Sequence, residues 1–363
     1  MITGLEPCKG SGSKGGMKTT GHSDTPPSRV LATLRREAVD RPPIWFMRQA
    51  GRSLPEYHRL RSQAPDFIAF CLNPEMAAEA TLQPMRRFAF DAAIIFADIL
   101  LLPQALGQTV WFEAGEGPRL GELPELNALQ GEIEASTARL SAVGESLTRV
   151  REALEPERAL IGFAGGPWTV ATYMLEGRGG DRAAARATAV AEPERVDRLI
   201  SILVEATIRY LIMQVRSGAE VLQLFESWAE LLPENDFERL VVGPHTRIIQ
   251  GLRAAGVETP VIGFPRGAGA LVENYADRAG VQGVGLDVQA AAAMGRRLQA
   301  KVAIQGALDP ILLRQGGAAL DQRVDTLLAQ WADGPHIFNL GHGVLPDTPV
   351  AHIAQVVRRV TGQ

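Results

Sequence analysis

Residues 159–177 read ALIGFAGGPWTVATYMLEG, and this stretch contains one strand, one turn and one helix in that order. Residues 159–163 are apolar throughout, as expected of a strand that is covered on both faces of a parallel sheet. A Gly-Gly-Pro turn follows and leads into a helical segment that carries Tyr173. A strand followed directly by a helix is the repeating unit of α/β folds.

The same pattern recurs along the chain and predicts the fold. Eight apolar runs alternate with helical segments, including plain helices at 192–215 and 236–256 and a helical excursion at 124–157. Eight parallel strands with crossover helices predict a single (β/α)8 barrel, with its active site at the carboxyl ends of the strands. An open doubly wound sheet is the alternative, but no GxGxxG motif opens a helix after any strand. The expected strands are residues 43–47, 92–97, 159–163, 219–225, 260–264, 282–286, 302–305 and 336–340.

Composition narrows the range of partners and cofactors. The chain of 363 residues has a net charge of −4, so no overall basic field indicates binding of nucleic acid. No apolar run approaches the ~18 residues of a membrane-spanning helix, so we expect no membrane association. The cysteines are Cys8 and Cys71, which allow no four-cysteine zinc site and favour a reducing cytoplasm. No HxH or HExxH spacing occurs, and we therefore predict no metal site.

Lysine usage separates the start of the chain from the rest. Three of the four lysines fall within the first 18 positions, and the fourth is Lys301. Residues 1–27 are rich in Gly, Ser, Thr and Pro and lack the apolar region of a signal peptide, so we expect a disordered tail before a barrel over residues 28–363. Lys301 precedes the strand expected at 302–305, at the wrong end of the barrel for Schiff-base chemistry.

Polar or conformationally special residues follow almost every expected strand. Active sites of barrels are built from the loops at these positions. Such loops are also polar in general, and for Arg266 and Asp287 the two explanations are equally good. The residues are Arg48, Asp98, Gly165 to Pro167, Glu226 and Ser227, Arg266, Asp287, Gly306 with Asp309, and Gly341 to Gly343.

Arg48 and Arg52 belong to the segment WFMRQAGR at 45–52. Residues four apart share one face of a helix, and two like charges there repel unless an anion lies between them. Arg61 would add a third guanidinium group. A solvated surface pair is the alternative, but the position at a strand end and Gly51 between the arginines favour binding of a carboxylate or phosphate.

Asp98 interrupts the apolar run AAIIFADIL at 92–100. A lone carboxylate among apolar residues is unfavourable to desolvate unless it has partners. Asp98 therefore either caps the next helix or is the single anion of a cationic pocket, where it pairs with N–H donors or a developing positive charge.

Tyr173 and His342 have weaker local contexts. A lone tyrosine in a helix is more often a core residue with a hydrogen-bonded hydroxyl group, and no lysine lies near this glycine-rich turn to bind phosphate. A lone histidine is usually a satisfied polar group, but His342 is flanked by Gly341 and Gly343. Glycine on both sides lets the backbone approach a ligand closely or adopt a positive φ.

Taken together, these motifs resemble the uroporphyrinogen decarboxylase family. The segments PIWFMRQAGRSLPEYHRLR at 43–61 and GFAGGPWTVATYMLEG at 162–177 are similar to its two signatures. The segments IIFADIL, LQLFESWA, FPRGAG, QGALDP and FNLGHGVLPDTP follow in the family's order. The resemblance extends from about residue 28 to the end of the chain.

The resemblance implies a cytoplasmic, homodimeric and cofactor-free enzyme with a distorted (β/α)8 barrel. Its reaction would convert the acetate side chains of uroporphyrinogen III to methyl groups, giving coproporphyrinogen III and CO₂ in haem biosynthesis. It implies catalytic roles for Asp98, Arg48 and Tyr173, with Asp98 contacting the pyrrole N–H groups. The implied substrate pocket consists of Arg48, Gln49, Ala50, Gly51, Arg52, Asp98, Tyr173, Ser227 and His342.

Three positions depart from the family pattern and bear on loop geometry and substrate affinity. The family more often has glycine at Glu230, tryptophan at Val288 and asparagine at Ala307.

Two alternative functions remain open. A corrinoid-linked methyltransferase on a related barrel would need a zinc site of histidine and cysteines, for which the folded region offers Cys71 alone. A non-catalytic porphyrinogen-binding paralogue would use the same pocket residues without turnover.

Overall fold

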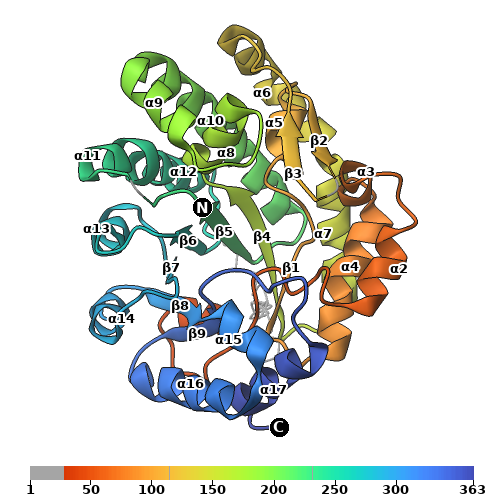
Figure 1. Cartoon of the computed structure of the whole chain (residues 1–363), viewed down its shortest axis with the longest axis vertical. Coiled ribbons are helices and arrows are strands. Elements are labelled where there is room, and N and C mark those ends of the chain that lie inside the picture. Colours follow the sequence, from red (N-terminus) through yellow and green to blue (C-terminus); the bar gives the residue numbers. More distant parts are fainter. Residues whose placement is uncertain (1–27, 114, 231) are drawn as a thin grey trace, which may run out of the picture.

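A computed structural model describes residues 28–113, 115–230 and 232–363, so the expected tail at 1–27 lies outside the described residues. Parallel strands form one seven-stranded sheet in the order β1-β4-β5-β6-β7-β8-β9, which curls inside a layer of helices (Figure 1). The strand order follows the chain without the reversal of a doubly wound sheet. The prediction of a (β/α)8-type barrel is therefore confirmed. The strands are β1 (Ala92–Ile94), β4 (Ala159–Gly165), β5 (Val221–Glu226), β6 (Val261–Pro265), β7 (Gly283–Gly285), β8 (Ala303–Leu308) and β9 (His336–Leu340).

The first expected strand, residues 43–47, occupies the eighth position of the barrel in irregular form. Ile44 makes a parallel bridge with Phe338 of β9, and the Phe338 N–H donates to the Pro43 carbonyl at 2.8 Å. On the other side, the Asp91 N–H donates to the Ile44 carbonyl at 2.8 Å, directly before β1. This segment thus connects the two edges of the sheet, although it is too irregular to form a regular strand.

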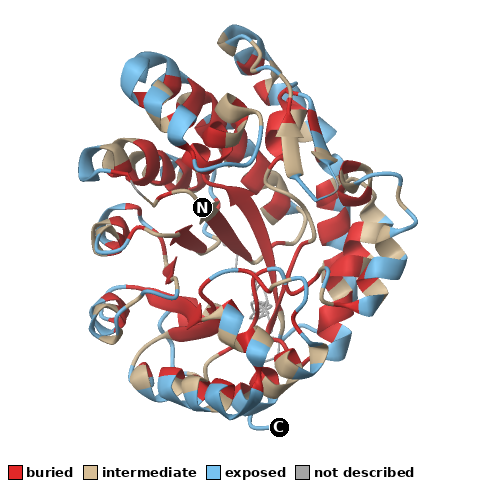
Figure 2. Ribbon diagram, viewed as in Figure 1, coloured by how far each residue is buried: buried red, intermediate tan, exposed pale blue. Residues whose placement is uncertain are grey.

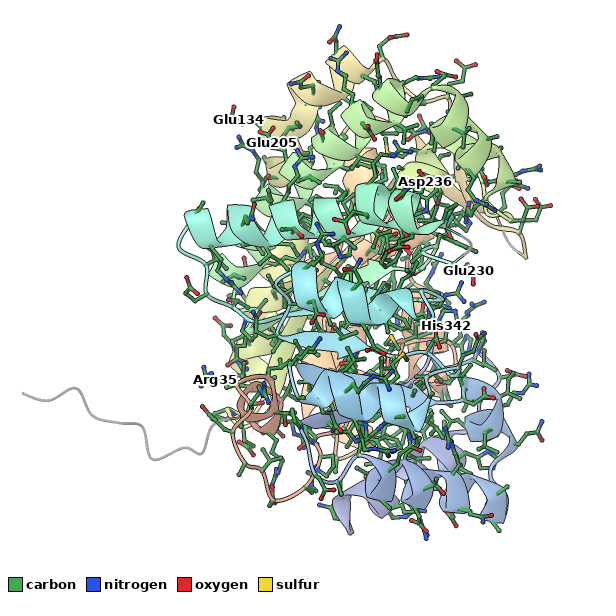
Figure 3. All side chains as sticks on the ribbon, turned by 90° about the vertical axis from the view of Figure 1, so that its left-hand side faces the viewer. Arg35, Glu134, Glu205, Glu230, Asp236 and His342 are labelled. Atoms are coloured by element: carbon green, nitrogen blue, oxygen red, sulfur yellow. The ribbon has the colours of Figure 1, made fainter. Side chains whose placement is uncertain are left out.

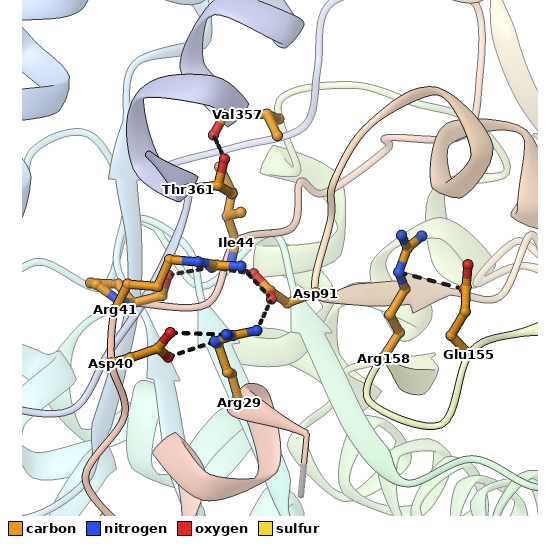
Figure 4. A network of polar contacts seen from close by, with 10 residues as sticks. Arg29, Asp40, Arg41, Ile44, Asp91, Glu155, Arg158, Val357 and Thr361 are labelled. Atoms are coloured by element: carbon orange, nitrogen blue, oxygen red, sulfur yellow. Dashed lines mark hydrogen bonds and ion pairs between the residues drawn. The ribbon is translucent and has the colours of Figure 1, made fainter. Parts of the chain in front are cut away.

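A network of charged side chains holds this closure at the amino-terminal end of the strands (Figure 4). The buried Asp91 carboxylate accepts two hydrogen bonds from the Arg41 guanidinium, at 2.7 and 2.9 Å. It also accepts the Ile44 N–H at 2.8 Å, and Arg29 approaches it at 3.5 Å. Arg29 is in turn paired with Asp40 on the surface. Asp91 therefore joins the irregular segment to β1.

The helices cover the outside of the barrel, and Figure 2 shows that most of them have an exposed outer surface around the largely buried strands of the seven-stranded sheet. The helices predicted at 192–215 and 124–157 are confirmed, and the one at 236–256 contains one π-helical turn. They are α1 (Arg29–Leu34), α2 (Pro55–Arg61), α3 (Phe67–Cys71), α4 (Pro74–Arg87), α5 (Leu101–Ala105), α6 (Leu126–Arg139), α7 (Ser141–Ala153), α8 (Pro167–Glu176), α9 (Ala183–Ala191), α10 (Pro193–Arg216), α11 (Glu234–Phe237), η1 (Glu238–Val242), α12 (Gly243–Ala254), α13 (Leu271–Arg278), α14 (Ala292–Gln299), α15 (Pro310–Gln315), α16 (Gly317–Gln330) and α17 (Val350–Thr361). Within the described ranges, no helix has the length and apolar character needed to cross a membrane.

Two features of the fold were not predicted. An antiparallel hairpin, β2 (Val110–Glu113) and β3 (Gly117–Leu120), lies between α5 and α6. Its sequence gives a weak strand signal because β3 contains Gly and Pro, which are disfavoured in strands.

The second feature is a row of buried polar side chains inside the barrel. The Trp45 indole donates to Gln305 at 3.0 Å, and Gln305 donates to Gln223 at 3.2 Å.

Candidate active site

The polar residues that follow the strands gather at one end of the barrel. Figure 3 shows His342 and Glu230 at this end and Arg35 at the opposite end. The closing segment, β1, α8 and the loops after β6 and β9 all contribute side chains here. The residues within electrostatic reach of Arg48 are Arg52, Asp98, Tyr173, Arg266 and His342.

Hydrogen bonds from the end of β9 fix the position of Arg48. The Met47 N–H donates to the Asn339 side-chain oxygen at 3.0 Å, and the Val344 N–H donates to the Met47 carbonyl at 2.9 Å. Arg48 itself has a φ of +61°, a left-handed conformation that is unfavourable for a residue with a side chain. The chain therefore turns sharply, and the side chain of Arg48 is left accessible to solvent.

The segment between Arg48 and Arg52 corrects one premise of the sequence argument. Residues 47–53 form turns and bends, and the next helix begins only at Pro55, so the two arginines do not share a helical face. Their guanidinium groups still influence each other, because Arg52 contributes to lowering the pKa of Arg48. The largest cause of that lowered pKa is partial desolvation of Arg48 by the surrounding protein, although the residue still reaches solvent, and the Asp98 carboxylate opposes it. Arg61 points its guanidinium over Phe70 instead.

Gln49 and Ala50 are buried, and Gly51 is half-buried. The Gln49 amide accepts the Phe46 N–H at 3.0 Å and donates to the Ala92 carbonyl at 3.0 Å. Gln49 thus braces the turn against β1 with its side chain directed into the protein. A pocket role for Gln49 would have to involve its main chain.

The glycines beside His342 provide space rather than unusual backbone angles. Neither Gly341 nor Gly343 has a positive φ. A Cβ on Gly341 would lie 2.7 Å from Val288 Cγ1, and one on Gly343 would lie 2.7 Å from Arg48 Cγ and even closer to Arg48 Cδ. Gly343 is therefore the surface against which the Arg48 side chain packs.

We expect Gly343→Ala to displace the Arg48 guanidinium and to raise KM by about tenfold, equivalent to ~1.4 kcal/mol of lost binding. Stability should change little, because the group that must move is the flexible end of a side chain. Steady-state kinetics and thermal unfolding would check both expectations. The matched control is Gly131→Ala on α6, where the added Cβ meets nothing within 4 Å. An unchanged KM in Gly343→Ala would contradict the packing role.

Asp98 is not the N-cap residue of α5, which is Leu100. Its carboxylate accepts the Leu100 N–H at 2.8 Å in the turn just before that helix. It also lies within electrostatic reach of Arg48 while remaining half-buried. Desolvation raises its pKa to about 6, and the Leu100 N–H and Arg48 counteract part of that rise. At neutral pH the group is a carboxylate, and its hydrogen-bonding capacity is incompletely used.

His342 is electrically neutral at physiological pH. Desolvation, together with the nearby charges of Arg48 and Arg266, lowers its pKa to about 4. A neutral imidazole can donate and accept hydrogen bonds but carries no charge to balance an anion.

These two pKa values predict the acid limb of the pH–rate profile. The carboxylate form of Asp98 is lost as pH falls through about 6, so kcat/KM should decrease below that pH, whereas His342 titrates only near 4. Activity measured from pH 5 to 8 should show this limb in the wild type and, at reduced amplitude, in His342→Asn. A limb that disappears in His342→Asn would contradict the assignment to Asp98.

Arg266, which the sequence left undecided, belongs to this cluster. Its guanidinium donates to the Ser227 carbonyl at 3.0 Å and to Glu230 at 3.2 Å. Glu230, one of the departures from the family pattern, is therefore paired with a cation. The other departures are an exposed Val288 and a buried Ala307.

Other polar residues after the strands have structural partners. Glu226 is fully buried, accepts the Thr169 N–H at 2.6 Å and lies 3.3 Å from the His245 imidazole. Asp309 caps α15, which agrees with the alternative that the loops after the strands are polar for structural reasons. Lys301 is paired with Asp277 ahead of β8, which agrees with its expected place at the opposite end of the barrel. Among the described residues, no cluster of three or more His, Cys, Asp or Glu side chains could hold a metal ion.

Comparison with known proteins gives one consistent result. The model of the family "Uroporphyrinogen decarboxylase (URO-D)" matches residues 25–363. The chain is 69% identical over 340 residues to uroporphyrinogen decarboxylase of Phenylobacterium zucineum, covering 93% of this chain and 99% of that protein. It is 62% identical over 335 residues to the enzyme of that name from Caulobacter vibrioides, covering 92% and 95%. A methyltransferase from Methanosarcina mazei has a similar fold, with a TM-score of 0.71 over 92% of this chain and 97% of that one, at 19% identity.

Proposed function

The chain belongs to the uroporphyrinogen decarboxylase family, and from this premise we propose how its residues carry out the family's reaction. The enzyme decarboxylates the acetate side chains of uroporphyrinogen in tetrapyrrole biosynthesis. Each acetate gains a proton and loses CO₂ to become a methyl group, and four such steps on the III isomer give coproporphyrinogen III. The site must therefore bind a polyanion and stabilise a cation that forms during the reaction.

Charge complementarity supports the assignment of the pocket. Uroporphyrinogen has carboxylates around its rim and pyrrole N–H donors at its centre. Guanidinium groups form charge-assisted hydrogen bonds with carboxylates, which suits Arg48 and Arg52 to the rim. Asp98 is suited to accept the central N–H groups, because its carboxylate has unused acceptor capacity. The observation that carries this proposal is that the Asp98 carboxylate and the Arg48 guanidinium lie within electrostatic reach of each other, both partly desolvated, after neighbouring strands of the barrel.

The same arrangement explains how decarboxylation proceeds on the substrate's own ring. A pyrrole protonated at a ring carbon is an iminium-like cation, and the electron pair of the breaking C–C bond flows into it to form an exocyclic C=C bond as CO₂ leaves. Protonation of the exocyclic carbon then gives the methyl group, and loss of the proton from the ring carbon restores the pyrrole. Asp98 stabilises that cation where it forms, which is an electrostatic contribution of the kind that dominates many enzyme reactions. The pyrrole thereby supplies the electron sink that pyridoxal phosphate or thiamine supplies elsewhere, so the proposed reaction is cofactor-free.

The remaining pocket residues have supporting roles in this proposal. Arg48 is too weak an acid to donate the proton, so it orients a carboxylate while water or a substrate carboxyl supplies the proton. Tyr173, Ser227 and neutral His342 contribute hydrogen bonds, and Gln49, Ala50 and Gly51 shape the turn that presents the arginines. We further propose a cytoplasmic homodimer, which sedimentation of the purified enzyme would test.

A mass-spectrometric assay tests the function directly. Incubation with uroporphyrinogen III should give products that have lost one to four CO₂ in sequence, without added metal or organic cofactor. Tight binding without loss of CO₂ would instead identify a non-catalytic porphyrinogen-binding protein.

A further inference from the structure

Arg182 is a buried arginine beside the site that no sequence motif singled out. Its side chain is 3% exposed, and its guanidinium carbon lies 4.1 Å from the ring centre of Tyr173 and 4.1 Å from that of Trp228. The two rings are themselves in edge contact, with centres 6.5 Å apart. The guanidinium thus contacts α8, which carries Tyr173, and the loop after β5, which carries Ser227 and Trp228.

The local surroundings of Arg182 are unfavourable for an arginine. It is the residue before α9, at the positive end of the helix dipole, where a cation is disfavoured. Its backbone has a φ of +65°, the left-handed conformation that favours glycine. Its Nε and Nη2 atoms are buried and have no hydrogen-bond partner among the residues described by the structure. Fold stability alone does not account for an arginine at this position.

The turn around Arg182 is nevertheless firmly held. Its Nη1 donates to the Glu176 carboxylate at 3.2 Å and to the Arg178 carbonyl at 2.9 Å, and the same carboxylate accepts the Ala185 N–H at 3.0 Å. The Leu120 N–H of β3 donates to the Gly177 carbonyl at 2.7 Å. The hairpin β2–β3 and the end of α8 therefore support the position of the guanidinium.

We propose that Arg182 is a positioning residue that fixes Tyr173 relative to the loop carrying Ser227 and Trp228. Cation–π contact with both rings restrains the two elements further. It adds to the edge contact of the rings and to two hydrogen bonds of the Trp228 main chain, whose N–H donates to the Thr169 hydroxyl at 3.2 Å and whose carbonyl accepts the Trp168 indole N–H at 3.0 Å. Arg266 lies 5.6 Å from the Trp228 ring and donates to the Ser227 carbonyl, so the loop is restrained by two arginines. This inference rests on the proposed role of Tyr173 in the reaction.

The test compares Arg182→Met, Tyr173→Phe and the double variant, each assayed with uroporphyrinogen III. We expect Arg182→Met to lower kcat by about tenfold in the wild-type background and by less than about twofold in the Tyr173→Phe background. The ratio of partially decarboxylated intermediates should also change in Arg182→Met, since displacement of Tyr173 alters the steps unequally. A smaller amount of folded enzyme would slow all steps equally and leave that ratio unchanged when samples are compared at equal conversion of uroporphyrinogen III.

Two further variants keep the result interpretable. Arg182→Lys retains the charge without the flat guanidinium and should recover part of the lost kcat, and it replaces Arg182→Met if that variant fails to fold. Arg186→Met, on the helix α9 that Arg182 precedes, is the matched control and should behave as the wild type. Equal losses from Arg182→Met in both backgrounds, or normal turnover in Tyr173→Phe, would overturn the proposal. Failure of the wild type to release CO₂ would instead refute the proposed function.

Discussion

Asp98→Asn should abolish most of the turnover, with kcat lowered by at least about 10²–10³-fold. The substitution keeps the size of the side chain but removes the negative charge that stabilises the protonated pyrrole. Substrate carboxylates should still bind the arginines, so KM should change far less than kcat. Stepwise CO₂ release measured by mass spectrometry would give both quantities, and near-normal kcat would remove Asp98 from the mechanism.

The same variant should be more stable than the wild type, which separates loss of chemistry from loss of folding. Because desolvation raises the pKa of Asp98 to about 6, this group contributes most stability below its usual pKa, and that contribution is lost as pH rises through about 6. At pH 7 the carboxylate is therefore destabilising, by on the order of 2–3 kcal/mol, and asparagine removes that penalty. A higher unfolding midpoint at pH 7, with no gain at pH 4, would support the assignment. Equal stability at both pH values would contradict it.

Asp91→Ala should destabilise the fold by about 3 kcal/mol without directly altering the site. Asp91 is buried at the opposite end of the barrel and accepts hydrogen bonds from Arg41 and from the Ile44 N–H. Its loss leaves those donors without a partner and loosens the segment that closes the barrel. Urea unfolding would measure the change in free energy.

The matched control is Asp40→Ala, which removes an ion pair between side chains that are 37% and 66% exposed. Exposed pairs contribute about 0–1 kcal/mol, so this variant should be close to wild type. Similar losses in both variants would show that Asp91 is no more important than a surface charge.

Local sequence patterns were sufficient for most of the fold. A buried parallel strand needs a continuous apolar run, and a covering helix needs an amphipathic one, so both leave a signal within a short window. The barrel strands after Arg48, including that at 159–163, were predicted within a few residues of their observed bounds. The segment 43–47 was expected to be a regular strand because it is apolar. Its irregular form depends on its partners at Phe338 and Asp91, which are distant in the sequence and leave no signal within the segment.

The candidate site was only partly predictable. Arg48, Asp98 and His342 were recognisable because each follows an apolar strand, and such residues converge in a barrel. The expectation that Arg48 and Arg52 share one face of a helix was wrong, because Arg48 has a left-handed backbone conformation and starts a turn. Arg182 gave no signal, since it is one arginine in a Gly- and Ala-rich loop and its ring partners are not its sequence neighbours.

The sequence by itself determined the alternation of strands and helices and the end of the barrel at which the polar residues of the candidate site lie. Burial and chain direction are encoded in the local order of apolar and polar residues. Only the tertiary structure decided that Gln49 points inward, that Gly343 makes room for Arg48, and that Arg182 lies between Tyr173 and Trp228. Those relations depend on which distant elements meet when the sheet closes, and no short window of sequence contains both partners.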